Sequence, residues 1–123
     1  MNKAPQIQWL SEPEKHDYGS AESYLNLLYP PSTTAEQVAR LKSARITEFK
    51  AKDIFRASRL PLLGISNSHV ERDLKKIRNN QKMSPLLLVR DPKDSKVIIA
   101  DGYHRLCAVY SRDEDALIPC KIV

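Results

Sequence analysis

Five consecutive residues near the end of the chain carry the side chains best suited to chemistry. They are Asp101, Gly102, Tyr103, His104 and Arg105, and they follow the apolar residues 97–100. A carboxylate or an imidazole can act as a general base, and a planar guanidinium can hold two phosphate oxygens at once. Asp101 and His104 are therefore the candidate catalytic residues, and Arg105 is a candidate phosphate ligand.

The same residues mark the start of a predicted helix. Residues 103–110 have helical spacing, and Gly102 separates them from the apolar run before it. The first turn of a helix exposes up to four unpaired N–H groups and roughly half a positive charge, which together form an anion site. Gly102 would let a ligand approach the backbone. The alternative is structural: Asp101 caps the helix, Gly102 makes a tight turn, and His104 and Arg105 lie on a solvated face.

The two cysteines, Cys107 and Cys120, form no CxxC pair and have no histidine at metal-ligand spacing. We expect two reduced thiols, with Cys107 packed among apolar neighbours rather than activated by His104. The pattern predicts no tightly bound metal, and it is typical of a cytoplasmic protein.

Length and composition indicate one ordinary globular domain. The chain has 123 residues, of which 41% are hydrophobic and 28% charged, a balance usual for folded proteins. No apolar run approaches the roughly 18 residues that span a bilayer, and the first residues lack the apolar stretch of a secretory leader, so we expect no membrane partner. The formal net charge of +5 favours anionic partners. A basic cluster of Lys75, Lys76, Arg78 and Lys82 keeps a nucleic-acid partner open.

Apolar residues at helical spacing predict three helices before the one at 103–110. The first runs from Ser20 to the prolines at 30 and 31, the second from a capping box of Thr33 and Glu36 toward Ala44, and the third from a capping box of Ser68 and Glu71 to Asn79. A short helical turn begun by Asp53 is expected at residues 52–58.

The expected strands are residues 46–50, 86–89, 97–100 and 118–123. The two continuous apolar runs predict buried strands joined as a hairpin, and Pro119 indicates that the last strand starts at an edge. Residues 1–17 are expected to form an arm or loop, and residues 60–63 a loop that buries apolar side chains.

Three segments of the chain together resemble the ParB/sulfiredoxin superfamily: residues 84–90, 98–108 and 118–123. The resemblance covers about residues 46–123. It implies an α+β fold in which helices pack on a small mixed β-sheet, preceded here by an N-terminal helical extension. We therefore expect an arm and helical extension over residues 1–45 and a ParB/sulfiredoxin-like domain over residues 46–123.

In this superfamily a nucleotide or other phosphate ligand sits on the helix that follows the glycine. Gly102, His104 and Arg105 match the Gly-x-His-Arg of sulfiredoxins, in which the histidine and arginine hold ATP phosphates. Tyr103 stands in the place of the sulfiredoxin catalytic cysteine. Because a phenol cannot form the thiolsulfinate intermediate, the resemblance excludes the sulfiredoxin reaction, and Cys107 lies a turn away and is no substitute.

The resemblance also implies contacts from an earlier helix. His69, Arg72 and Lys76 align with family positions that help contact the nucleotide, although none matches by identity. Ser84 completes the predicted phosphate or nucleotide contacts. The alternative for the helix is a solvated basic face.

Two other branches of the superfamily match less well. The chromosome-partition motif Gly-Glu-Arg-Arg-x-Arg-Ala loses two of its three arginines in residues 102–108, and we expect no helix-turn-helix or dimerisation domain after Val123. Free serine kinases share the Asp-Gly-x-His-Arg sequence, but the position of their catalytic glutamate offers Arg56, Ser58 and Arg59 here. Overall, the chain looks most like small bacterial proteins labelled ParB-like.

The sequence thus predicts a phosphate- or nucleotide-binding ParB-like domain whose reaction is not identified. The expected ligands are ATP, ADP or CTP with Mg²⁺, or a phosphorylated small molecule. One alternative is a small-molecule kinase or other phosphotransferase, with Asp101 or His104 as base and Arg105 stabilising charge on the phosphate. The other is a DNA-associated ParB-like module or nuclease.

Overall fold

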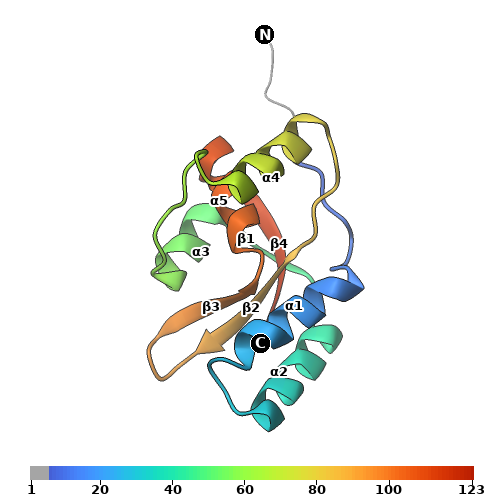
Figure 1. Ribbon diagram of the computed structural model, residues 1–123, viewed down its shortest axis with the longest axis vertical. Coiled ribbons are helices and arrows are strands. Elements are labelled where there is room, and N and C mark those ends of the chain that lie inside the picture. The colour runs from blue at the N-terminus through green and yellow to red at the C-terminus, as the bar shows by residue number, and fades with distance from the viewer. Residues whose placement is uncertain (1–5) are drawn as a thin grey trace.

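A mixed four-stranded β-sheet forms the centre of the molecule. In the computed structural model, which describes residues 6–123, the strands are β1 (Thr47–Lys50), β2 (Leu86–Asp91), β3 (Lys96–Asp101) and β4 (Leu117–Ile122), in the order β1-β4-β2-β3 (Figure 1). β2 and β4 are parallel, whereas β1 with β4 and β2 with β3 are antiparallel. Together with five helices among the described residues, this sheet confirms the predicted α+β class and the predicted hairpin.

Helices lie on both faces of the sheet. α1 (Lys15–Leu25) and α2 (Pro31–Ser43) cover one face, and α3 (Ala51–Ser58), α4 (Ser68–Arg78) and α5 (Tyr103–Arg112) lie on the other side (Figure 1). Successive residues of a strand point to opposite faces. Leu87 accordingly packs with α1 and α2, and Leu86 packs with the other three helices. This arrangement explains why residues 86–89 are apolar throughout.

Within residues 6–123 no helix combines the length and the apolar character needed to cross a bilayer. The division of the chain into an extension and a domain at residue 45 stays a prediction.

The first helix begins at Lys15, earlier than the predicted start at Ser20. Glu14 and Asp17 form a reciprocal capping box, in which the Glu14 backbone N–H donates to Asp17 Oδ2 (2.8 Å). The predicted loop at residues 1–17 is therefore wrong from Lys15 onward, because its polar residues hold a helix start. Its first five residues lie outside the described part of the chain.

Residues 8–10 lie beside the segment that leads into β2. The Met83 N–H donates to Gln8 O (2.9 Å), and the Leu10 N–H donates to Met83 O (2.8 Å). Trp9, between them, packs against the larger hydrophobic core. Residues 8–10 of the predicted arm are thus hydrogen-bonded to Met83, in the segment between α4 and β2.

Two predicted capping boxes are wrong. α2 begins at Pro31, whose ring favours the first helical position, so Thr33 already lies inside the first turn. α4 does begin at Ser68, but the cap is Asn67, whose side-chain oxygen accepts from the second and third helical N–H groups at 3.0 and 3.2 Å. Neighbouring residues that can both cap leave the sequence pattern ambiguous by one position.

The segment after β1 also differs from the prediction. α3 begins at Ala51 rather than Asp53, because β1 runs directly into it. Leu60 and Leu62 are 40% and 50% exposed, so the expectation of a buried loop is wrong for both. Leu63 does pack against the larger core.

β4 lies inside the sheet, but its first residues, up to Pro119, pair with β1 alone, in agreement with the expectation that the strand starts at an edge. Parallel pairing with β2 begins at Cys120, and Pro119 pairs only with β1. The missing N–H of proline is tolerated there because β4 has one partner at that residue.

Candidate functional site

The start of α5 is a helix N-terminus formed at Gly102. Gly102 follows the last residue of β3 and has φ 108°, a backbone conformation that side chains disfavour. The first helical hydrogen bond runs from the Leu106 N–H to Gly102 O (2.9 Å), and no side chain of the described residues caps the helix. The N–H groups of residues 103–105 therefore lie at the positive end of α5 without a side-chain acceptor.

Position 102 requires a glycine because of close contacts with other residues of the protein, not with a ligand. A Cβ atom at position 102 would lie 2.7 Å from Leu86 Cγ and 3.0 Å from Arg105 Nη2. Both the dihedral angle and the packing thus demand Gly102, and they place the first turn of α5 directly against the beginning of β2.

Arg105 folds back onto Asp101 instead of lying on a solvated face. Its Nη2 lies 2.9 Å from Asp101 Oδ2 and also donates to Pro85 O (3.4 Å), and the two charged side chains are 17% and 16% exposed. The Arg105 Nε–H is buried and has no acceptor among residues 6–123. The guanidinium is therefore held along one edge, and Asp101 is a partner of Arg105 rather than the helix cap.

The carboxyl of Asp101 is in a mixed environment. Burial raises its pKa, the Arg105 guanidinium opposes that rise, and the neighbouring Asp17 carboxyl raises the pKa further. Asp17 comes from α1 and is 3% exposed. This side of the α5 start is therefore rich in negative charge.

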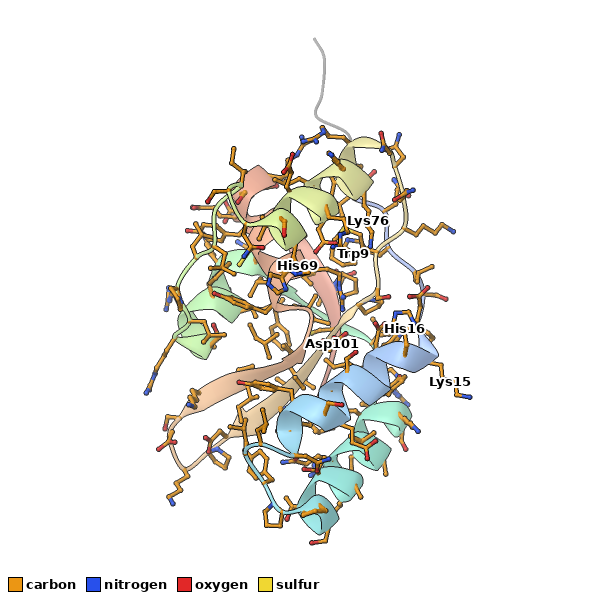
Figure 2. The ribbon with its side chains drawn as sticks, viewed as in Figure 1. Trp9, Lys15, His16, His69, Lys76 and Asp101 are labelled. Carbon is orange, nitrogen blue, oxygen red and sulfur yellow. The ribbon has the colours of Figure 1, made fainter. Side chains whose placement is uncertain are left out.

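The other side of the α5 start is basic. The rings of His104 and His69 lie 4.8 Å apart between centroids, with His69 coming from α4 (Figure 2). Burial lowers the pKa of His104, the positive charge of His69 and of Arg72 lowers it further, and Asp73 opposes them. A positive potential at His104 thus arises from side chains of α4.

Three residues predicted to contact a phosphate, namely Arg72, Lys76 and Ser84, lie at different places around the start of α5. Arg72 is near enough to His104 to act on it electrostatically. Lys76, 44% exposed, has its Nζ 3.8 Å from Asp73 Oδ1 on the same helix. Ser84 is 7% exposed and its Oγ donates to Glu14 Oε2 at 3.5 Å, toward α1.

The backbone N–H of Tyr103 lies in the uncapped first turn of α5, whereas its side chain contacts another loop. Its hydroxyl donates to the Pro61 carbonyl in the loop after α3. Cys107 is fully buried in the same region, as predicted for a packed thiol, and burial raises its pKa. Burial likewise raises the pKa of Cys120 to about 12. Neither thiol is placed as an activated nucleophile.

Two residues at the position of the kinase glutamate, Ser58 and Arg59, have structural contacts. Ser58 Oγ donates to Phe55 O (2.9 Å), and Arg59, with φ 58°, donates from Nη2 to Ser95 O (3.3 Å). Asp53, the nearest carboxylate in the sequence, is inside the first turn of α3. The structure shows no contact that would give Asp53 a role at the start of α5 within the described residues.

Sequence reasoning missed Glu14, His16 and Asp17 at the start of α1. His16 Nε2 lies 3.2 Å from Glu14 Oε2 and 3.4 Å from Asp17 Oδ1. Figure 2 labels His16 on α1, and its neighbour Asp17 is close enough to Asp101 to raise the pKa of that carboxyl. The spacing of Glu14 and Asp17, one acid three residues after another before a helical pattern, is the signal that would have shown the helix start.

No family model, no curated protein and no solved structure matches this chain.

Proposed function

We propose that the chain binds a phosphate-bearing ligand, a nucleotide in the first place, at the start of α5. The observation that supports the proposal is the uncapped first turn at Gly102, together with the Arg105 Nε–H, which is buried and has no acceptor among residues 6–123. Free N–H donors at the positive end of a helix, together with a guanidinium from its first turn, suit a phosphate oxygen.

Charge around the site favours an anion on the α4 side. His104 has a lowered pKa because burial and the positive groups His69 and Arg72 disfavour its protonation. A phosphate placed there would offset that repulsion and add an acceptor for the imidazole. The α1 side, where Asp17 and Asp101 meet, disfavours an anion.

Asp101 acts in this proposal as a positioning residue for Arg105. A guanidinium has five N–H donors, and the contacts with Asp101 and Pro85 engage Nη2. In the proposal, Nε and Nη1 are the donors left for a phosphate oxygen. Because both two-donor edges of the guanidinium include Nη2, the proposal has single hydrogen bonds from Nε or Nη1 in place of the bidentate grip expected from the sequence.

The finer fold is part of the same proposal. We infer a ParB/sulfiredoxin-like domain from the resemblance over residues 46–123, in which the phosphate ligand sits on the helix after the glycine. The mixed sheet, the hairpin and a helix that starts at Gly102 agree with that inference.

Calorimetric titration of ADP, ATP, CTP and inorganic phosphate tests the proposal. Arg105→Ala should weaken nucleotide binding at least about tenfold, because a hydrogen bond to a charged group contributes roughly 1.5–3 kcal/mol. Arg40→Ala, which removes the same charge from an exposed position on α2, should change the affinity less than about twofold. Equal weakening by both variants, or no saturable binding by the unaltered chain, would overturn it. Thermal unfolding of each variant shows that it is folded.

A further inference from the structure

Two histidines from different helices form a pair of imidazoles beside the start of α5. The ring centroids of His69 and His104 lie 4.8 Å apart, and the ring planes are inclined by 41°. His69, labelled in Figure 2, is the second residue of α4 and is exposed, whereas His104 is the second residue of α5 and is half-buried. Two protonated rings at this distance repel each other, which disfavours the doubly charged pair at least about fourfold even at the dielectric constant of water. The pair therefore takes up its second proton at a lower pH than its first.

The surroundings of His104 also oppose its protonation. The ring belongs to the first turn of α5, and the N-terminal end of a helix carries roughly half a positive charge. On α4, Arg72 adds a positive charge and the buried Asp73 opposes it. Burial, His69 and Arg72 thus lower the pKa of His104, and Asp73 raises it.

The other neighbours of α5 bring no further charge to the ring. α3 and β2 pack against α5, but within residues 6–123 neither contributes a charge that acts on His104. The Tyr103 ring lies 5.7 Å from the His104 ring, and its hydroxyl donates to Pro61 O. The Arg105 guanidinium is paired with Asp101. The balance at His104 is therefore set by the dipole of α5 and by three residues of α4.

We propose that the pair of His69 and His104 makes anion binding at the start of α5 proton-linked, so that the site binds an oxyanion more tightly as the pH falls. The inference rests on the proposed function for the presence of the anion and specifies how its binding is regulated. An anion at the first turn offsets the positive end of the helix and the charges of α4, and it accepts a charge-assisted hydrogen bond from the protonated ring. His104 then holds a proton beside His69 that it does not hold in the free chain.

The direction of the pH dependence follows from linkage. The bound anion raises the pKa of His104 above its value in the free chain. Between the two values the free ring is neutral and the ring in the complex is protonated, so binding takes up a proton and the affinity rises as the pH falls. Above both values the affinity does not depend on this ring. A His104 pKa that is higher by about one in the complex gives a gain of up to about tenfold.

Sulfate is the probe that isolates the histidines. It keeps both negative charges between about pH 5.5 and about pH 8, whereas a phosphate group takes up a proton in this range. Titration of the full chain with sodium sulfate at constant ionic strength, followed by amide and imidazole NMR, measures the affinity and the pKa of each histidine. We expect an affinity about three- to tenfold higher at pH 5.5 than at pH 8, and a His104 pKa that sulfate raises.

Three variants assign the effect to the pair. His104→Gln keeps a neutral hydrogen-bond donor, so it should bind sulfate at pH 8 and lose the gain at pH 5.5. His69→Ala removes the neighbouring positive charge and should raise the His104 pKa in the free chain. His16→Ala is the matched control, because this third histidine lies on α1 and is 75% exposed; the gain should remain. Thermal unfolding at both pH values shows that each variant is folded.

The outcomes separate this inference from the proposed function. Saturable binding with the same affinity at both pH values, a His104 pKa unchanged by sulfate, or a gain that persists in His104→Gln would overturn the proton linkage alone. An unchanged His104 pKa in His69→Ala would overturn the role of the pair. Absence of saturable sulfate and ADP binding at both pH values would overturn the proposed function and the proton linkage with it.

Discussion

Replacing Gly102 by alanine tests whether the start of α5 is as constrained as its geometry indicates. The new Cβ would lie 2.7 Å from Leu86 Cγ and 3.0 Å from Arg105 Nη2, at a residue with φ 108°. The strained dihedral costs about 1–2 kcal/mol, and the overlap with a packed core leucine costs about 1–3 kcal/mol. The smaller freedom of alanine in the unfolded chain offsets about 0.4–1 kcal/mol of this.

We therefore expect Gly102→Ala to lower the free energy of unfolding by about 2–4 kcal/mol, or Tm by roughly 8–16 °C for a domain of this size. Urea unfolding and calorimetry measure both quantities. Gly64→Ala is the matched control, because a Cβ there meets nothing within 4 Å and the residue has no positive φ. Its effect should stay under about 1 kcal/mol. Similar effects of the two substitutions, or a loss below 1 kcal/mol in Gly102→Ala, would refute the reasoning.

Three further predictions concern other parts of the molecule. Asn67→Ala should lower the free energy of unfolding by about 1 kcal/mol in urea unfolding, because it removes the α4 cap. Ser68→Ala should change it by less than half of that. A larger loss in Ser68→Ala than in Asn67→Ala would show that Asn67 is not the cap. Burial, followed by the charge of His69, lowers the pKa of His104, so its contribution to stability is complete above about pH 6.5 and is lost as the pH falls through its folded value. An NMR titration giving His104 a pKa at or above its ordinary value contradicts this. Cys107 and Cys120, both fully buried with raised pKa values, should resist Ellman's reagent in the native protein and react in concentrated guanidinium, and rapid native labelling would contradict their burial.

The centre of the fold could be predicted because its signals are local. Residues 86–89 and 97–100 are continuous apolar runs separated by turn residues, which indicates two buried strands in a hairpin. Gly102 after the second run, followed by helical spacing, placed the start of α5 correctly. In each case neighbouring residues along the chain determine the structure.

Helix starts were less predictable because several neighbouring residues are able to cap. Asn67 rather than Ser68 caps α4, and Pro31 rather than Thr33 fixes the start of α2. The polar run before α1 has the composition of a loop, yet Glu14 and Asp17 satisfy the first N–H groups of a helix. Side-chain chemistry favours both structures, and packing of α1 on the sheet decides between them.

The arrangement of the candidate site depended on contacts between distant segments. Asp17 meets Asp101 because α1 packs beside β3, and His69 meets His104 because α4 packs beside α5. Neither contact leaves a pattern in the spacing of one sequence. The sequence thus indicated the five residues at the α5 start, and the resemblance added His69 and Arg72 on the basic side. Nothing in it indicated Asp17 on the acidic side.

Backbone amide NMR of the unaltered chain, titrated with ADP, tests the phosphate site most directly. We expect saturable shifts that are largest at the amides of Tyr103, His104 and Arg105 and at the Arg105 Nε–H signal, and that disappear in Arg105→Ala. Shifts that stay linear in ADP concentration, or that are largest at the lysines near the end of α4, would contradict it.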